Sequence, residues 1–208
     1  MDIANAYNSW SAQYDTNDNK TRDLEALSLQ KIVQGKNFKH CLEVGCGTGK
    51  NTAWLLTICD QITAIDLSNG MLEIAKNKIL SDKVHFIEAD ITKDWTFAKD
   101  TYDLVTFSLM LEHIEDLDAV FQKLAKLSNK GTRVYIGELH PFKQYAGSKA
   151  RFETESGTQV VTCFNHHVTD FIQAATASGF QLLKLDEQFD NADRTQIPRI
   201  LNLLFEKL

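Results

Sequence analysis

The sequence lacks the features that mark membrane and secreted proteins. No apolar run approaches the roughly 20 residues that a membrane-spanning helix needs. The first 15 residues, MDIANAYNSWSAQYD, have neither a basic start nor an apolar core, so they do not resemble a signal peptide. We therefore expect a cytoplasmic protein with no membrane partner.

Cysteine and positive charge are also scarce. The four cysteines form no CxxC pair, so we expect free thiols buried in a protein of a reducing compartment (Cys41, Cys46, Cys59 and Cys163). Lysine and arginine together number 22 against 28 acidic residues, which gives a formal net charge of −6. Phosphate backbones are bound mainly by Lys and Arg, so this balance argues against a nucleic-acid partner.

What is present fits one globular domain. A chain of 208 residues can bury roughly 70% of the surface that its unfolded form exposes. Its 43% hydrophobic and 24% charged residues are ordinary for a globular protein. The sequence contains no internal repeat, low-complexity tract or linker, and we therefore expect a single domain over residues 1–208.

Strand and helix signals alternate along the chain. Strands are predicted at 40–44, 61–65, 84–88, 102–107 and 133–137, and helices at 22–33, 52–59, 69–80, 116–127 and 168–178. Ser68 is expected to cap the third helix, and residues 129–131 to form a turn before the fifth strand. The tail, 180–208, has two β-like runs around a polar loop, as an antiparallel pair at a sheet edge would. This order predicts an α/β fold with a mostly parallel sheet covered on both faces.

A glycine-rich loop follows the first predicted strand. Residues 42–49 read LEVGCGTG, and glycines there let the backbone turn sharply and let a ligand approach closely. The dinucleotide pattern G-x-G-x-x-G needs a glycine at position 50, where the sequence has Lys50. This disfavours a nicotinamide oxidoreductase.

Two further polar features fall at the ends of predicted strands. Asp66 ends the second strand, about 20 residues after the glycine loop, where an acid accepts hydrogen bonds from ribose hydroxyls. Residues 88–91, EADI, end the third strand and offer a polar edge beside an apolar wall for an adenine ring. Ligands of open α/β sheets bind outside the carboxyl ends of the strands, which predicts one shared site.

Four motifs in this order and spacing resemble those of class I S-adenosylmethionine-dependent methyltransferases, and specifically the type 11-like ones: LEVGCGTG, AIDLSNGML, EADI and YDLVTFSLMLEHI. The resemblance spans roughly residues 14–137, and the tail matches more loosely. It implies a Rossmann-like, three-layer αβα sandwich with a seven-stranded, mostly parallel sheet and an antiparallel last strand. It also implies S-adenosylmethionine as cofactor and methyl transfer as the activity.

The resemblance assigns roles to individual residues. Glu43, Gly45 and Gly47 would lie under the methionine part, Asp66 would hold the ribose, and Asp90 would meet the adenine amine. The whole set implied to bind the cofactor is Tyr14, Glu43, Gly45, Cys46, Gly47, Asp66, Leu67, Met71, Asp90, Ile91, Ser108 and Leu109. Each acid also has a simpler reading: Glu43 as an exposed strand-end charge, Asp66 as a helix cap and Asp90 as a solvated loop residue.

The N-terminal region, 1–34, resembles the lid and first helix of the family. Its Tyr14-Asp15 pair matches a YD pair that closes over the cofactor, and Tyr14 would then lie near the methionine part. Alternatively, Tyr7, Trp10 and Tyr14, which recur at helical spacing, dock a helix on the core.

Substrate specificity is expected in the insertion at 138–167, which mixes aromatic and ionisable residues. His140, at a strand end, is the first candidate for a base or acceptor-orienting group, and a turn-stabilising role before Pro141 is the alternative. His113 is expected to pack at a helix start rather than to act as a base. His166 or His167 facing the pocket is a further option, but adjacent histidines point apart, so no metal site is expected.

The predicted acceptor is a small molecule with O, N or C as the methylated atom. Methyltransferases of nucleobase amines carry an Asn/Asp-Pro-Pro-aromatic run after the fourth strand, where this sequence has SLMLEH at 108–113. The alternatives are a protein or RNA methyltransferase and a non-catalytic S-adenosylmethionine-binding protein. The expected assembly is a monomer or a homodimer.

Overall fold

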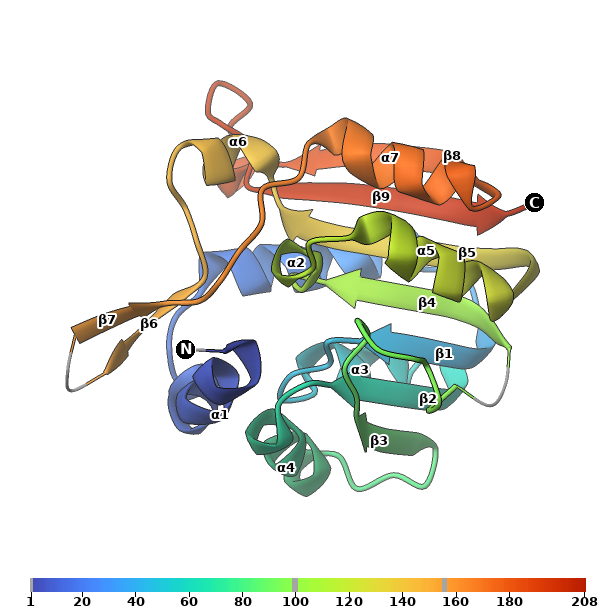
Figure 1. Ribbon diagram of the computed structural model, residues 1–208, viewed down its shortest axis with the longest axis horizontal. Coiled ribbons are helices and arrows are strands. Elements are labelled where there is room, and N and C mark those ends of the chain that lie inside the picture. Colours follow the sequence, from blue (N-terminus) through green and yellow to red (C-terminus); the bar gives the residue numbers. More distant parts are fainter. Residues whose placement is uncertain (1, 99–100, 155–156) are drawn as a thin grey trace.

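A computed structural model describes residues 2–98, 101–154 and 157–208, and a seven-stranded sheet forms its centre (Figure 1). The strand order is β3-β2-β1-β4-β5-β9-β8. The bounds are β1 (Phe38–Val44), β2 (Cys59–Asp66), β3 (Val84–Glu88), β4 (Tyr102–Ser108), β5 (Ser128–Leu139), β8 (Phe180–Gln188) and β9 (Ile200–Lys207). Strands β1 to β5 run parallel, whereas β9 is antiparallel to both β5 and β8. The predicted fold class is confirmed.

Helices cover both faces of this sheet (Figure 1). Their bounds are α1 (Ile3–Tyr14), α2 (Lys20–Val33), α3 (Lys50–Leu55), α4 (Asn69–Lys78), α5 (Leu117–Lys126), α6 (Pro141–Tyr145) and α7 (Val168–Ala177). Helices α5 and α7 pack on one face, and α2, α3 and α4 pack on the other. Within the described ranges, no helix combines the length and the apolar composition that crossing a membrane requires.

Local sequence explains where the helices begin. The Asn19 side chain accepts the N–H groups of Thr21 and Arg22, Ser68 Oγ accepts that of Met71, and Asp116 starts α5 in the same way. Such N-caps satisfy donors that the first turn of a helix leaves free. The cap predicted at Ser68 is confirmed.

Two predicted boundaries were wrong. The helix expected at 52–59 ends at Leu55, because the chain turns there and the Ile58 carbonyl accepts the Phe38 N–H at the start of the sheet. The turn expected at 129–131 lies inside β5, which begins at Ser128 and shifts register against β4. Thr132 Oγ1 donates to the Tyr102 carbonyl across this irregularity, so tertiary pairing extends the strand through Gly131.

The insertion after β5 reaches back to the N-terminal helix. It contains α6 and a hairpin of β6 (Arg151–Thr154) and β7 (Gly157–Val160), which projects beside α1 (Figure 1). Phe152 of this hairpin stacks on Trp10 of α1, with ring centroids 5.3 Å apart. Residues 155–156 of the insertion and Met1 of the expected lid lie outside the described residues.

Candidate functional site

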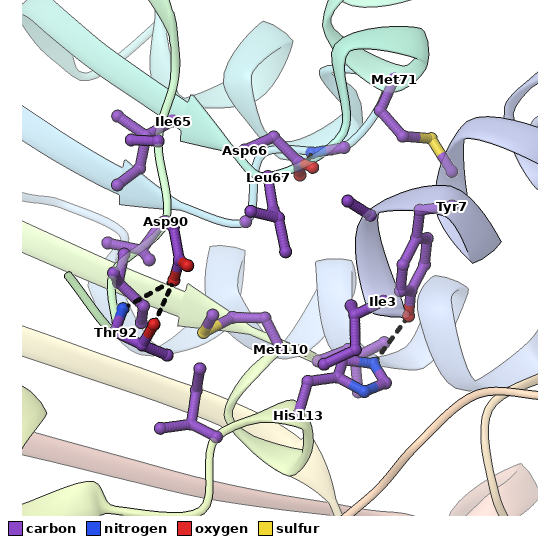
Figure 2. A pocket seen from close by; sticks show the side chains of 18 of the residues that line it. Ile3, Tyr7, Ile65, Asp66, Leu67, Met71, Asp90, Thr92, Met110 and His113 are labelled. Carbon is purple, nitrogen blue, oxygen red and sulfur yellow. Dashed lines mark hydrogen bonds between the residues drawn. The ribbon is translucent and has the colours of Figure 1, made fainter. Parts of the chain in front are cut away.

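A cavity of about 500 Å³ opens at the carboxyl ends of β1, β2, β3 and β4 (Figure 2). Ten of the twelve residues expected to bind the cofactor line it: Tyr14, Gly45, Gly47, Asp66, Leu67, Met71, Asp90, Ile91, Ser108 and Leu109. Strands β1, β2 and β4 end level with one another, since Val44 pairs with both Ile65 and Phe107. Parallel pairing therefore brings residues far apart in the sequence to one rim.

Asp66 is held rigidly at this rim. Its Oδ2 accepts the Gly47 N–H and its Oδ1 accepts the Ser68 N–H, both at 2.8 Å. Burial raises the pKa of Asp66, and these two backbone donors oppose that rise. An ionised carboxylate has about four acceptor positions, so capacity remains for donors of a bound molecule.

The glycine loop needs glycine for two reasons. Gly45 and Gly47 have φ of 76° and 54°, in the left-handed region that side chains disfavour. A Cβ at Gly45 would also lie 2.9 Å from the Met110 side chain. A larger residue at position 45 would therefore strain the backbone and displace the cavity wall.

The far end of the cavity is formed by the segment after β3. Asp90 Oδ1 accepts both the N–H and the hydroxyl of Thr92, at 2.8 and 2.6 Å (Figure 2). Ile91 beside it is buried. The sequence of residues 88–91 predicted this arrangement of an acid next to an apolar wall. Asp90 also stabilises its own turn through the two hydrogen bonds with Thr92.

Glu43 and Cys46 do not line this cavity. They border a smaller recess of about 50 Å³ that shares Tyr14 and Gly47 with it. Glu43 is only 3% exposed and accepts the Thr52 hydroxyl at 2.6 Å, so it is not the exposed charge of the simpler reading. Burial raises the pKa of Glu43 to about 8.

Arg22 is a residue of the same recess that the sequence analysis missed. Its guanidinium stacks on the Tyr14 ring at 4.0 Å and donates to the carbonyls of Tyr14 and Asn17. Its Nε is buried and has no hydrogen-bond partner among the described residues. A sequence signal existed, because a basic residue in the first turn opposes the helix dipole.

Glu138 is a second missed residue, and it shapes the loop after β4. Its Oε1 accepts the N–H groups of Met110 and Leu111, at 3.0 and 2.8 Å. The preceding Leu109 has φ of 53°, a conformation that costs a non-glycine residue free energy. Burial raises the pKa of Glu138 to about 8. The sequence signal for Glu138 was an acidic residue inside the apolar run VYIGEL, residues 134–139.

The structure corrects the expectation for His140. The side chain is 1% exposed, caps α6 by accepting the Phe142 N–H at Nδ1, and places Nε2 3.1 Å from Glu187. Burial lowers its pKa against the opposing effect of Glu187. His140 lines neither this cavity nor the one described below, because both of its ring nitrogens bond within the fold. His166 and His167 line neither cavity either.

His113 is the histidine that reaches the cavity (Figure 2). Its Nδ1 lies 2.7 Å from the Thr162 carbonyl, and its Nε2 lies 2.8 Å from the Tyr7 hydroxyl. A carbonyl only accepts, so Nδ1 carries the proton and Nε2 accepts from Tyr7. Burial raises the pKa of Tyr7 well above its usual value, so the hydroxyl keeps its proton.

Helix α1 forms part of the cavity wall through Ile3, Ala4 and Tyr7. The Asn8 side-chain oxygen accepts from Ser68 Oγ and the Gly70 N–H, at 2.7 and 2.9 Å, which joins α1 to the start of α4. Just beyond α1, Asp15 accepts the Thr48 hydroxyl at 2.6 Å. The helix is thus joined to the rim by a small number of polar bonds.

A second cavity, of about 300 Å³, adjoins the first and shares Tyr7, Tyr14 and Leu109 with it. Residues 148–151 of the insertion form part of its wall. Its ionisable lining includes four cations and one acid: Arg22, Lys149, Arg151, Arg199 and Glu112. Positive charge therefore prevails in this cavity, in contrast to the acidic molecule as a whole.

Comparison with known proteins points to one family. Residues 42–136 match the family model described as a methyltransferase domain. An uncharacterized methyltransferase of Emericella nidulans is 25% identical, over 89% of this chain and 78% of that protein. The ubiquinone biosynthesis O-methyltransferase of Nitrosomonas europaea is 31% identical, over 54% of this chain and 48% of its own length. This match thus spans about half of that relative.

The fold is shared with solved structures as well. The structure of a complex between DhpI and S-adenosylhomocysteine superposes with a TM-score of 0.77 at 22% identity, over 98% of this chain and 94% of that one. A likeness at this identity establishes the fold. The match therefore supports the arrangement of sheet and helices described above.

Proposed function

We propose that this chain is a class I S-adenosylmethionine-dependent methyltransferase that transfers the cofactor's methyl group to a small, negatively charged acceptor. The pair of adjoining cavities carries this proposal. One cavity has the polar rim that the cofactor needs, and the other is rich in cations. The methyl group would face the acceptor at their junction, beside Tyr7, Tyr14 and Leu109.

The larger cavity suits the nucleoside part of the cofactor. Asp66 would accept hydrogen bonds from the two ribose hydroxyls, and Asp90 would accept one from the adenine amine. Leu67 and Ile91 would cover the two faces of the adenine ring. Met71, Ser108 and Leu109 would complete the wall.

The small recess suits the charged end of the methionine part. Arg22 has a buried Nε without a partner among the described residues, and a carboxylate would satisfy it. Glu43 borders the same recess, and the cofactor's ammonium group would favour the ionised form of this carboxyl group and donate hydrogen bonds to it. Gly45 and Gly47 have no side chain, so the backbone there would come close to the cofactor's methionine part, between its carboxylate and ammonium groups. Cys46 is buried behind these two glycines.

Methyl transfer from a sulfonium is a direct displacement, so the protein contributes mainly by aligning the acceptor. Cations of the second cavity, Arg151 and Lys149 among them, would hold an acidic group of the acceptor such as a carboxylate or phosphate. Where the acceptor must lose a proton, the Tyr7–His113 pair is the group nearest the junction.

The release of S-adenosylhomocysteine, measured with acidic, neutral and basic small molecules, tests this proposal. We expect turnover with acidic acceptors, and Arg151→Ala should raise the KM of the acceptor about tenfold with little change in the KM of the cofactor. Arg194→Ala is the control, because Arg194 lies on Phe189, outside both cavities. Turnover restricted to protein or RNA, or cofactor binding without any turnover, would contradict the proposal.

A further inference from the structure

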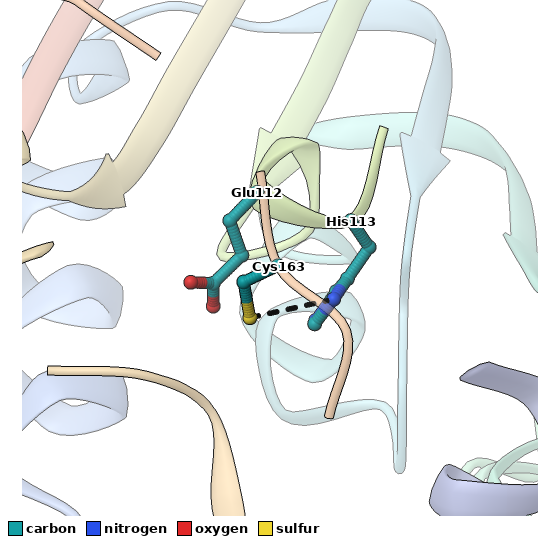
Figure 3. Close-up of side chains that lie close together, drawn as sticks. All are labelled: Glu112, His113 and Cys163. Atoms are coloured by element: carbon teal, nitrogen blue, oxygen red, sulfur yellow. Dashed lines mark hydrogen bonds between the residues drawn. The ribbon is translucent and has the colours of Figure 1, made fainter. Parts of the chain in front are cut away.

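Three side chains of different chemistry converge beside the two cavities: Glu112, His113 and Cys163 (Figure 3). One possible ligand atom from each lies within 4.8 Å of the other two. Glu112 and His113 end the short 3-10 helix η1 (Leu111–His113), and Cys163 lies in the segment between β7 and α7. The sequence places these residues 50 positions apart, so only the fold brings them together.

The fold holds this cluster in place through the backbone. The Phe164 N–H donates to the Glu112 carbonyl at 2.7 Å, and His113 Nδ1 donates to the Thr162 carbonyl at the same distance. Cys163 lies between these two contacts, with Sγ 3.9 Å from His113 Nδ1. The segment that carries the thiol is therefore fastened to η1 on both sides of Cys163.

Glu112 has no partner at contact distance that carries a positive charge. It is 6% exposed, and the described residues form no ion pair with it, although cations line the cavity that it borders. The Gln144 amide donates to it at 3.4 Å. A buried acid is costly without a cation in direct contact, and a metal ion between the carboxylate and the sulfur would provide one.

We propose that Glu112, His113 and Cys163 form a binding site for a divalent transition metal, with Zn²⁺ as the fitting ion. A thiolate, an imidazole and a carboxylate together select a borderline-soft metal over Mg²⁺ or Ca²⁺. Zn²⁺ binds sulfur at about 2.3 Å and nitrogen or oxygen at about 2.0–2.2 Å, so the three atoms must close by roughly an ångström. Three protein ligands leave a fourth position for water or for a group of a bound molecule.

The site would join both cavities. His113 lines the larger one and Glu112 lines the cationic one. On binding, the thiol proton passes to solvent, Nδ1 of His113 becomes a ligand in place of its bond to Thr162, and the imidazole proton sits on Nε2. That proton is then donated to Tyr7, which reverses the Tyr7–His113 hydrogen bond. The metal thus acts on the group that borders the cofactor.

Titration of the metal-free, reduced chain with Co²⁺ tests the site, with absorption as the readout. We expect one equivalent to bind and to produce a thiolate-to-cobalt charge-transfer band together with the visible bands of a four-coordinate site. Cys163→Ser should lose the charge-transfer band and bind at least about tenfold more weakly. His167→Gln, four residues along the same segment and outside the cluster, should behave as the wild type.

Absence of the band in the wild type would overturn the proposal. So would its persistence in Cys163→Ser, because the three buried cysteines would then be the source. If Cys163→Ser does not fold, Glu112→Gln provides the second test, since it keeps the side-chain shape and removes the charge. It should keep the charge-transfer band and weaken Co²⁺ binding at least about tenfold, and an unchanged affinity would overturn the proposal. Neither measurement needs cofactor or acceptor.

Discussion

Among the individual residues of the site and its surroundings, three buried acids and the half-buried Asp66 stand out. Burial raises the pKa values of Glu25, Glu43, Asp66 and Glu138, and hydrogen bonds to backbone or hydroxyl donors hold each side chain in one orientation. Such preorganised groups bind a ligand without reorganising when it arrives. Glu25 and Glu43 border the recess beside the glycine loop, Asp66 accepts the Gly47 N–H, and Glu138 holds the loop after β4.

A prediction for a single residue concerns His140. Replacing it with alanine removes the N-cap of α6 and the contact with Glu187, so His140→Ala should lower the free energy of unfolding by about 1–2 kcal/mol. Turnover should stay near the wild-type value, because the ring does not reach either cavity. Urea denaturation and steady-state kinetics check both statements. A loss of 100-fold or more in turnover from a folded His140→Ala protein would restore the base role.

The positions of site residues were predictable from the sequence where a motif fixes them. Asp66 and the glycines follow directly from their places at strand ends, and ten of the twelve expected residues line one cavity. His140 was misplaced because a strand end does not fix which way the next side chain points. Local signals mark Arg22 and Glu138 as unusual residues but do not show their partners, which for Glu138 are the distant Met110 and Leu111.

At the level of elements, α1 is held to the rest of the fold by one small apolar cluster around Trp10 and by side-chain hydrogen bonds at two points. Asn8 joins it to α4, and Tyr7 joins it to η1. Elements fastened by a small number of polar bonds open more readily than the core does. This fits a lid that must admit both the cofactor and the acceptor.

Hydrogen exchange of α1 tests this view of the lid. Asn8→Ala removes the acceptor for Ser68 and Gly70, so α1 should exchange about fivefold faster or more in the cofactor-free protein, which corresponds to the loss of about 1 kcal/mol. Ser9→Ala is the matched control, because Ser9 bonds only within α1 among its described partners. S-adenosylmethionine should slow exchange in all three proteins. Equal rates with and without cofactor would rule out the lid.

The elements themselves were predicted well where periodicity and caps agree. The tail pairs as an antiparallel β8–β9 unit at the sheet edge, and α4 starts at its predicted cap. The start of β5 was mispredicted because Asn129-Lys130-Gly131 has the composition of a turn, while pairing with β4 keeps it in the sheet. At residues 129–131, pairing with β4 therefore outweighs the local preference for a turn.

On the scale of the whole molecule, the buried acids should make stability depend on pH. Glu43 and Glu138 have pKa values of about 8 in the folded chain and about 4.3 when unfolded, so the folded chain binds more protons between these values. The free energy of unfolding should therefore fall as the pH rises from about 5 to about 8, by up to about 1.4 kcal/mol per pH unit for each group. The lowered pKa values of Asp15 and Asp190 act below about pH 4 instead.

Urea denaturation across this pH range measures the effect. Glu138→Gln keeps an oxygen that accepts from Met110 and Leu111 while removing the titration, so its profile should be flatter than that of the wild type. A wild-type stability that is constant or rises across the range would show that these carboxyl groups are ionised in the folded chain.

Calorimetric titration of S-adenosylmethionine into the wild type and Asp66→Ala tests the assignment of the larger cavity. We expect one site in the wild type, and a loss of about 1.5–3 kcal/mol on removing the charged partner of the ribose, which is roughly a 10- to 150-fold weaker affinity. Asp60→Ala, at the opposite end of β2, should bind as the wild type does. An unchanged affinity in a folded Asp66→Ala protein, or no binding to the wild type, would contradict the assignment of the cavity to this cofactor.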